Sequence, residues 1–357
     1  MSRVCIIGAS NLINISLISI YTSYLEKNKV DYDLIYWDRK GLTELNKAKN
    51  AYKYIRLLNG VSFWKKILYY LGFSLYAHRI LIKNDYEYVI IWQTSVAYLL
   101  IVLLLTKYRH KYILNIRDYI AEKKIIFEVL IRILTKYSVI NTISSKGFLS
   151  FLPTKRDYQL IESVNSELIH GEKIIAHSRI SDKIKIGFVG SCRYFDENRR
   201  IIDRLANDER FELWFCGENS YVLKNYALMK SISNVFVIDT FPREDTLSIF
   251  GKFDIINSCF GCDNLANSTL VPIRLFTALS QGLPVMASKG MFLANLLKIT
   301  NLGIEVDSFA DNLGDYIFNY ISNLDYDKFS FLAHEYLLGA VNTNVDFQRK
   351  LDEFLMS

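Results

Sequence analysis

Residues 267–288 read NSTLVPIRLFTALSQGLPVMAS, a stretch that joins a helix directly to a strand. The polar residues 267–269 are typical of a helix cap, and Pro272 suits a first helical turn, where its missing N–H costs nothing. Gly282 then ends the helical pattern, and Pro284 opens a short apolar strand. A helix that runs into a buried strand is the repeating unit of an α/β protein with a parallel sheet.

The same alternation of strand and helix patterns extends over almost the whole chain. In the second half, apolar runs typical of strands occur at residues 183–190, 211–217, 234–240, 253–258, 284–288 and 303–307. In the first half, they occur at residues 3–7, 33–36, 88–92, 112–116 and 139–143. Strands that are apolar on both faces and separated by helices predict doubly wound parallel sheets.

At 357 residues the chain is long for one α/β domain and suits two. We expect two Rossmann-like parallel-sheet domains, residues 1–165 and 182–325, which face a cleft. A link of lower hydrophobicity at residues 163–181 separates them. Two helical patterns at residues 326–357 end the chain and can cross back over the cleft. Open parallel sheets bind ligands beyond the carboxyl ends of their strands, so both domains should present ligand sites to that cleft.

Charge is divided unevenly between the halves of the chain. Residues 1–180 hold 26 Lys and Arg against 14 Asp and Glu, whereas residues 181–357 hold 17 against 23. The first half therefore carries a net charge of +12 and the second −6, and we expect the first half to face an anionic partner. No RNA- or DNA-reading motif accompanies the basic half, so we expect no nucleic-acid partner.

Two apolar stretches of the first half are candidates for contact with a membrane. Residues 88–105 (YVIIWQTSVAYLLIVLLL) are interrupted by Gln93, Thr94 and Ser95, which favours a strand, a turn and a helix over a membrane span. Residues 63–83 (FWKKILYYLGFSLYAHRILIK) are aromatic, basic and helical in period. They fit an amphipathic helix on a membrane surface or an ordinary helix packed on the sheet, and periodicity does not separate the two. In the membrane interpretation, the inserted side chains include Phe63, Trp64, Tyr69 and Phe73.

The five cysteines predict buried packing residues in a reducing compartment. Cys5, Cys192, Cys216 and Cys259 lie in or beside apolar runs. Cys259 and Cys262 have CxxC spacing, but a structural zinc site needs two more ligands, and the chain has no second CxxC or HxxxH pattern. We expect no metal and no cofactor. The first residues read as a strand without a secretory signal, so we expect a cytoplasmic protein.

Two turns of the second half are candidate anion sites. Gly190, Ser191 and Arg193 follow a strand and precede a helix, where backbone N–H groups and a guanidinium can bind phosphate. The alternative is that Arg193 is a solvated turn residue. Ser268 and Thr269 belong to the proposed helix cap, and Arg274 lies one turn inside that helix. A phosphate at this helix start would meet both the free N–H groups and the Arg274 side chain.

In the first half, candidate site residues follow two strands. Gly8 and Ser10 form a short turn after residues 3–7, which lacks the G-x-G-x-x-G pattern of dinucleotide binding. This turn is either a contact for an acceptor substrate or a plain connection. Arg117 and Asp118 follow residues 112–116, and Asp118 is the candidate general base. The alternative is that Asp118 caps a helix or pairs with Arg117.

The second half resembles a known family. The pattern P-[NI]-[KR]-L-[FY]-x-A-L followed by G-x-P-V-[IM]-x-S resembles the donor-binding helix of GT-B glycosyltransferases from bacterial capsule and exopolysaccharide clusters. Three further blocks match in the family's order: VINTISSKGFLSFLP at residues 139–153, KIGFVGSCRYFDENRRII at residues 185–202 and NVFVIDTFPRED at residues 234–245. The matching blocks lie between residues 111 and 307, over half of the chain.

The resemblance implies a function for each part. Residues 1–165 would bind the acceptor, and residues 182–325 would bind the nucleotide-sugar donor without a metal ion. The donor and its phosphates would contact Gly190, Ser191, Arg193, Ser268, Thr269, Arg274 and Thr277. The acceptor would be a polyprenyl-diphosphate-linked glycan at the inner face of the cell membrane. An anionic membrane surface and other polysaccharide-assembly enzymes are then the expected partners.

The chain departs from the family at positions that matter for the reaction. Retaining members carry two glutamates eight residues apart, and the matching residues here are Thr269 and Thr277. The second of these glutamates normally contacts the donor ribose. Ile273 stands where an Asn is common. A catalytically silent GT-B partner subunit and a GT-B sugar-nucleotide epimerase therefore remain as alternatives to an active transferase.

Overall fold

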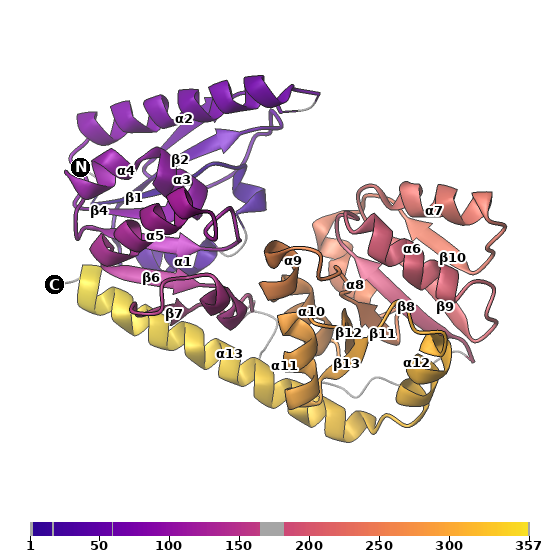
Figure 1. Cartoon of the computed structure of the whole chain (residues 1–357). Helices are drawn as coiled ribbons and strands as arrows, with labels where there is room; N and C mark the ends of the chain where they lie inside the picture. Colours follow the sequence, from indigo (N-terminus) through magenta and orange to yellow (C-terminus); the bar gives the residue numbers. More distant parts are fainter. Residues whose placement is uncertain (1–2, 16–17, 59, 165–181, 356–357) are drawn as a thin grey trace. The chain divides into compact units, whose positions relative to one another are not determined.

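The chain folds into two units, each built on one parallel sheet (Figure 1). The computed structural model describes residues 3–15, 18–58, 60–164 and 182–355. Unit 1 comprises Met1–Glu162 and Thr343–Ser357, and unit 2 comprises Ser163–Asn342. The predicted α/β class with two parallel-sheet domains is confirmed. Most of the predicted link, residues 165–181, lies outside the described residues.

Unit 1 contains a seven-stranded sheet with the order β3-β2-β1-β4-β5-β6-β7, in which all neighbours are parallel. Its strands are β1 (Val4–Gly8), β2 (Tyr32–Asp38), β3 (Asn50–Ile55), β4 (Tyr88–Trp92), β5 (Tyr112–Ile116), β6 (Ile140–Ile143) and β7 (Gln159–Leu160). Its helices are η1 (Leu12–Asn14), α1 (Ser19–Lys27), α2 (Phe63–Lys83), α3 (Thr94–Leu99), α4 (Ile101–Leu105), α5 (Ile125–Tyr137) and η2 (Lys146–Ser150). The strand order reverses between β1 and β4, and open α/β sheets generally bind ligands outside the carboxyl ends of the strands at such a point.

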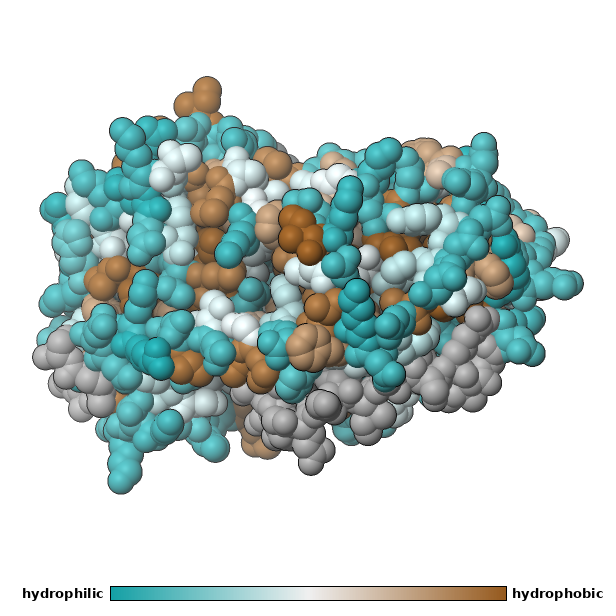
Figure 2. Space-filling view, turned by 90° about the horizontal axis from the view of Figure 1, so that it is seen from below, coloured by the Kyte–Doolittle hydropathy of each residue, from teal (hydrophilic) through white to brown (hydrophobic). Residues whose placement is uncertain are grey.

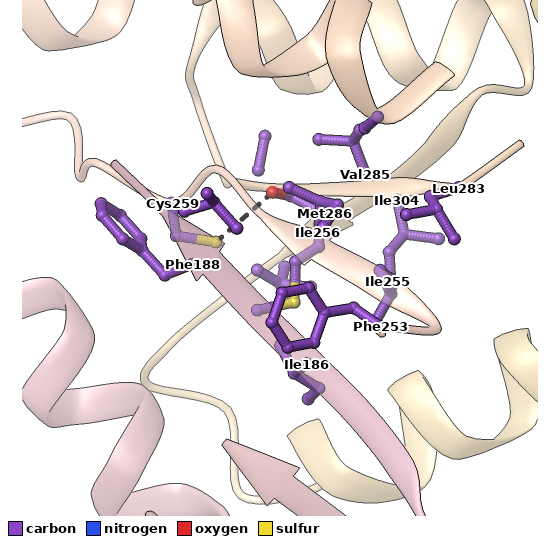
Figure 3. Close-up of a cluster of buried hydrophobic side chains, with 14 of the residues drawn as sticks. Ile186, Phe188, Phe253, Ile255, Ile256, Cys259, Leu283, Val285, Met286 and Ile304 are labelled. Carbon is purple, nitrogen blue, oxygen red and sulfur yellow. Dashed lines mark hydrogen bonds between the residues drawn. The ribbon is translucent and has the colours of Figure 1, made fainter. Parts of the chain in front are cut away.

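Unit 2 contains a six-stranded parallel sheet with the order β10-β9-β8-β11-β12-β13. Its strands are β8 (Ile184–Val189), β9 (Phe211–Cys216), β10 (Val235–Ile238), β11 (Ile255–Asn257), β12 (Val285–Ser288) and β13 (Gly303–Val306). Its helices are α6 (Phe195–Arg204), α7 (Ser220–Met229), η4 (Arg243–Asp245), α8 (Thr246–Phe250), α9 (Leu265–Thr269), α10 (Ile273–Ser280), α11 (Phe292–Thr300) and α12 (Leu313–Ser322). In its core, Phe188, Phe253 and Met286 belong to one buried cluster, and the Phe253 ring lies against Gly187, where any Cβ would clash (Figure 3).

The eleven strands predicted from apolar runs are present, with ends that differ by at most two residues. The sequence missed β3 and β7. Strand β3 is an edge strand whose residues are exposed or half-buried, so it lacks an apolar run, and β7 has only two residues. An edge strand pairs on one side only, and hydropathy is a weak guide to such strands.

The chain ends in one helix, α13 (Tyr326–Leu355), where the sequence indicated two helical patterns. Its first part places Phe329, Ala333, Leu337 and Ala340 in the core of unit 2. Its second part places Phe347, Leu351 and Leu355 in the core of unit 1. The buried stripe is interrupted between Ala340 and Phe347, and this interruption explains the two separate patterns in the sequence.

Helix α2 has a buried face and an exposed apolar face. Phe73, Ala77 and Leu81 are fully buried, and the Phe73 ring stacks on Trp37 with 5.9 Å between centroids. The expectation that Phe73 inserts into lipid is therefore wrong, and Tyr69 is half-buried beside the same tryptophan. On the other face, the side chains at least half exposed include Phe63, Trp64, Leu68, Leu71, Leu75 and Ile82.

On the face shown in Figure 2, hydrophilic residues predominate and apolar residues form small groups. Residues 88–105 form β4, α3 and α4, as the interruption at Gln93 predicted. No helix within the described ranges has the length and hydropathy that a membrane span requires.

Two glycine substitutions test the packing of this fold. Gly339 is exposed in α13, and no atom lies within 4 Å of a Cβ added there. Gly339→Ala should raise the free energy of unfolding by about 0.5–1 kcal/mol, because alanine loses less backbone entropy. At Gly303 an added Cβ would overlap the carbonyl of Val285, so Gly303→Ala should lower that free energy by about 3 kcal/mol. Urea denaturation followed by circular dichroism measures both, and equal effects would contradict the β12–β13 packing.

Candidate functional site

A pocket of about 420 Å³ lies in unit 2, beside the carboxyl end of β8. It is lined by residues 163–164, the end of β8, the segment from Phe241 through α8, and helix α10. Its walls are mainly apolar and include Val189, Phe241, Leu247, Phe250 and Phe276. Polar and charged residues, among them Arg243, Glu244 and Arg274, also line it, and apolar walls with placed polar groups are typical of sites for small molecules.

Glycine residues shape the rim of this pocket. Gly190 follows β8 with φ = +125°, and its N–H donates to the carbonyl of Cys216 at 2.8 Å. Gly217 follows β9 with φ = +129°, and a Cβ there would overlap the Gly190 carbonyl. The two turns therefore pack backbone against backbone, and both positions need glycine. This contact fixes the Gly190 turn that the sequence identified.

Arg274 connects two strand ends below this rim. Its Nε donates to the carbonyl of Val189 at 2.7 Å, and its Nη1 donates to the carbonyl of Asn257 at 2.9 Å. The guanidinium lies 3.8 Å from the Phe188 ring centroid. Burial lowers the pKa of Arg274 to about 10, so the side chain stays cationic at neutral pH. Its Nη2 lies nearest to Gly190, at 3.1 Å from an ideal Cβ on that glycine.

The structure corrects the proposed helix cap. Asn264 caps α9, and its Oδ1 accepts from the N–H of Asn267 at 2.9 Å. Ser268 and Thr269 therefore lie at the end of α9, not at the start of α10. Pro272 is the N-cap of α10 and has no side-chain cap bond. Because residues 270–272 break the helical path, the expected single capped helix is two helices.

The remaining predicted donor residues divide between the pocket and its surroundings. Thr277 lines the pocket, and its Oγ1 donates to the carbonyl of Ile273 at 3.3 Å. Thr269 is buried, and its Oγ1 donates to the carbonyl of Leu265. Ser191 is half-buried and Arg193 is exposed, and neither lines the pocket. The structure thus brings Gly190, Arg274 and Thr277 together and leaves the others outside.

Two charged residues that the sequence analysis did not select also line the pocket. Arg243 and Glu244 belong to η4, and both are exposed. They lie inside the family-like block at residues 234–245, but nothing in their spacing marked them. Their position depends on α8, which follows η4 in the chain and packs beside α10, and only the tertiary structure shows this packing.

A buried carboxylate, Glu197, stabilises the same edge of the sheet. Its oxygens accept from Ser288 at 2.7 Å, from Ser308 at 3.1 Å and from Arg200 at 2.5 Å. These bonds join α6 to the residues that end and follow β12 and β13. With its oxygens used in this way, Glu197 orders the loops around the site.

In unit 1, the predicted residues lie at the carboxyl edge of the sheet. Gly8 ends β1 and is paired with Trp92, which in turn is paired with Asn115. A Cβ on Gly8 would lie 2.5 Å from Cδ1 of Ile15, so a larger residue there would require the Ile15 side chain to shift. Ser10 is half-buried in the following turn.

Arg117 and Asp118 lie beyond the end of β5. Arg117 is buried, and its guanidinium is 5.5 Å from the Trp92 ring centroid. Burial lowers its pKa. Asp118 is exposed. The loop that carries Asp118 is anchored by Glu122, whose carboxylate is fully buried. This carboxylate accepts four hydrogen bonds, which come from Thr94 Oγ1, Tyr98 Oη and the N–H groups of Ile120 and Ala121.

Glu162 is a second candidate base that the sequence analysis missed. Burial raises the pKa of its carboxyl to about 7, although Lys146 and Arg117 act in the opposite direction. A carboxyl that titrates near neutrality is suited to proton transfer. Asn344 fixes its backbone through two hydrogen bonds, one to the Glu162 carbonyl at 3.0 Å and one from the Glu162 N–H at 2.9 Å.

No protein-family model matches the chain, and neither does any curated protein sequence. Solved structures of similar fold include a sucrose-phosphate synthase from Thermosynechococcus elongatus, with 9% identity, a TM-score of 0.75 and 100% of both chains covered. Anabaena Alr3699/HepE in complex with UDP and glucose has 10% identity, a TM-score of 0.65 and 100% of both chains covered. WaaG, a glycosyltransferase involved in lipopolysaccharide biosynthesis, has 13% identity and a TM-score of 0.64, with 94% of this chain and 95% of that chain covered. The likeness shows that the chain has the GT-B fold.

The two arginines of the predicted donor site should differ in their effect on stability. Arg274→Ala removes the donors to two strand-end carbonyls, and we expect the free energy of unfolding to fall by about 3 kcal/mol. Arg193 is exposed, so Arg193→Ala should change that free energy by less than about 0.5 kcal/mol. Urea denaturation of both variants measures the difference. An Arg274→Ala variant as stable as the wild type would show that these bonds do not hold the strand ends.

Proposed function

We propose that the protein is a glycosyltransferase that moves a sugar from a nucleotide-sugar donor to a glycan acceptor. The observation that carries the proposal is the unit 2 pocket, which combines apolar walls with Gly190 and the cationic Arg274 at its rim. An apolar wall suits a nucleobase, and a glycine turn with a guanidinium suits phosphate. The GT-B fold and the family-like blocks of the second half support the same function.

The donor in this proposal is a uridine nucleotide sugar bound by unit 2. HepE, which has a similar fold, contains UDP and glucose in its crystal structure. The base would lie against the apolar walls, and the diphosphate would lie towards Gly190 and Arg274, with Arg193 and Ser191 in the same turn. Arginines and backbone N–H groups would stabilise the departing diphosphate, so the proposed reaction needs no metal ion.

The acceptor hydroxyl needs a base if the reaction inverts configuration. Asp118 and Glu162 are the candidates in unit 1, Asp118 because it is exposed at a strand end and Glu162 because its pKa is about 7. Arg117 would act by its charge on both groups, since it interacts electrostatically with each of them.

A second candidate function is a catalytically silent partner subunit. The observation that favours it is the absence of a carboxylate at positions 269 and 277, where both threonine hydroxyls donate to backbone carbonyls. In this case the protein would bind a nucleotide sugar but transfer nothing. Product formation with an acceptor separates the two functions.

The acceptor in this proposal is a polyprenyl-diphosphate-linked glycan of a surface polysaccharide, met at the inner face of the cell membrane. The exposed apolar face of α2 supports this, because a monomer in water rarely exposes such a continuous stripe. Lys65, Lys66, Arg79 and Lys83 are exposed on the same helix and would contact anionic lipid headgroups. WaaG, whose fold is similar, takes part in lipopolysaccharide biosynthesis.

Donor binding can be measured directly by calorimetry with UDP-, GDP-, dTDP- and CMP-sugars. We expect at least one to bind, with the same affinity in EDTA, and Arg193→Ala to weaken it by about 1.5–3 kcal/mol through the loss of a charge-assisted contact. Asp245→Ala, which changes an exposed residue outside both the pocket lining and the Gly190 turn that carries Arg193, is the control. Failure of every nucleotide sugar to bind would refute the function, and binding that requires manganese would refute the metal-free site.

Membrane binding can be measured by flotation with liposomes. We expect the wild type to float with anionic vesicles and not with neutral ones, and the bound fraction to fall as salt rises. Lys65→Glu with Lys66→Glu, and separately Trp64→Ser with Leu68→Ser, should each reduce flotation, because they remove charge and apolar area respectively.

The matched control for flotation is Lys252→Glu with Lys298→Glu, which makes the same charge change at exposed residues of unit 2. If this control reduces flotation as much as the α2 variants, net charge and not α2 governs binding. A wild type that stays in the soluble fraction at low salt would contradict the lipid-linked acceptor.

A further inference from the structure

The charges around the unit 2 pocket are of both signs. Arg243 and Arg274 are cationic, and Glu244 is the one acidic residue among the described residues that line it. Glu244 is exposed, and its side chain makes no hydrogen bond or ion pair with any residue in the described ranges, including Arg243. A carboxylate in this position is available to a ligand.

The chemistry of a carboxylate limits which part of a nucleoside diphosphate can face it. It accepts hydrogen bonds only, and it repels phosphate. In the proposed binding mode the diphosphate lies away from Glu244, beside Gly190 and Arg274, which line another part of the same pocket. The remaining hydrogen-bond donors of the ligand belong to the ribose and the base.

Exposure separates these two parts of the ligand. The base needs the apolar walls, where Phe250 and Phe276 are buried. Glu244 instead lies in an exposed turn of η4, as do its neighbours Arg243 and Asp245. The ribose joins base and diphosphate, and its two adjacent hydroxyls can each donate to one oxygen of a carboxylate. An exposed carboxylate at the pocket edge matches this pair of donors.

We propose that Glu244 binds the ribose 2′,3′-diol of the nucleotide and makes the protein selective for ribonucleotides over 2′-deoxyribonucleotides. The inference rests on the proposed donor-binding function. On α10, Thr277 and Ser280 also line the pocket, but their hydroxyls donate to the carbonyls of Ile273 and Thr277 and supply no charge. In this chain the carboxylate would thus come from η4 and not from α10.

The experiment compares ribonucleotides and deoxyribonucleotides by isothermal titration calorimetry. The probes are UDP with 2′-deoxy-UDP, and GDP with 2′-deoxy-GDP. The wild type should bind the better ribonucleotide about tenfold to hundredfold more tightly than its deoxy form, as for a hydrogen bond to a charged group. In Glu244→Ala this ratio should fall to near one, because the ribonucleotide loses affinity and the deoxyribonucleotide loses much less.

Two further variants keep the test independent of folding. Asp245→Ala removes the neighbouring acid, which does not line the pocket, and should leave the ratio unchanged. Glu244→Ala combined with Thr277→Glu places a carboxylate on α10 at the same pocket and should restore part of the ratio. Restored selectivity in this double variant would also prove that Glu244→Ala is folded.

The outcomes distinguish this inference from the function on which it rests. A wild type that binds no nucleoside diphosphate refutes the donor-binding function. A wild type that binds UDP or GDP but shows no preference over the deoxy form refutes the role of Glu244 alone. Equal weakening of both forms by Glu244→Ala would place the carboxylate on the base, and a ratio that survives Glu244→Ala would assign the diol to another group. Either result overturns the proposal.

Discussion

The contact of the Arg274 guanidinium with the carbonyls of Val189 and Asn257 is the constraint on which the candidate site depends. A charged group buried in a protein is costly unless its donors are used, and here two carbonyls and the face of Phe188 use them. The lowered pKa of Arg274 records this cost. The bonds hold the ends of β8 and β11 together, and they place Arg274 Nη2 3.1 Å from a Cβ built on Gly190, which is a tight contact.

The same contacts position the residues that line the pocket in unit 2. Arg274 is held below Gly190 by its bonds to two strand-end carbonyls, and the turn at Gly217 packs directly against Gly190. The apolar walls and the exposed η4 turn then complete a surface with a cationic and an anionic part.

In unit 1, buried carboxylates anchor the loops at the carboxyl edge of the sheet. Glu122 anchors the loop after β5, and Asp38 anchors the loop after β2 by accepting from Asn11 at 2.8 Å and from the N–H groups of residues 40–42. Burial acts to raise the pKa of Asp38, but the bonds from Lys53, Asn11 and this loop hold it well below its usual range. Both loops lie at the carboxyl edge of the sheet, so the proposed acceptor side is also shaped in advance.

The sequence by itself determined the α/β class, the two parallel sheets and eleven of the thirteen strands that lie in the described ranges. It could do so because buried parallel strands are apolar on both faces and differ in pattern from the helices between them. It also marked the Gly190 turn and Arg274. It did not determine that residues 264–280 form two helices, that Phe73 faces the core, or that α13 is continuous. Helix phase and capping depend on which neighbour each side chain meets, and local pattern does not contain that information.

Only the tertiary structure decided which charged residues share a site. Glu244 and Arg274 are thirty residues apart, and they line one pocket because α8, which follows η4, packs beside α10. Glu162 has a raised pKa because the fold buries it, although nothing around it in the sequence is unusual. Apolar periodicity is a local property, so the sequence carries it. A charged residue becomes buried, and residues distant in sequence come into one site, only when the chain has folded, so the structure was needed to identify them.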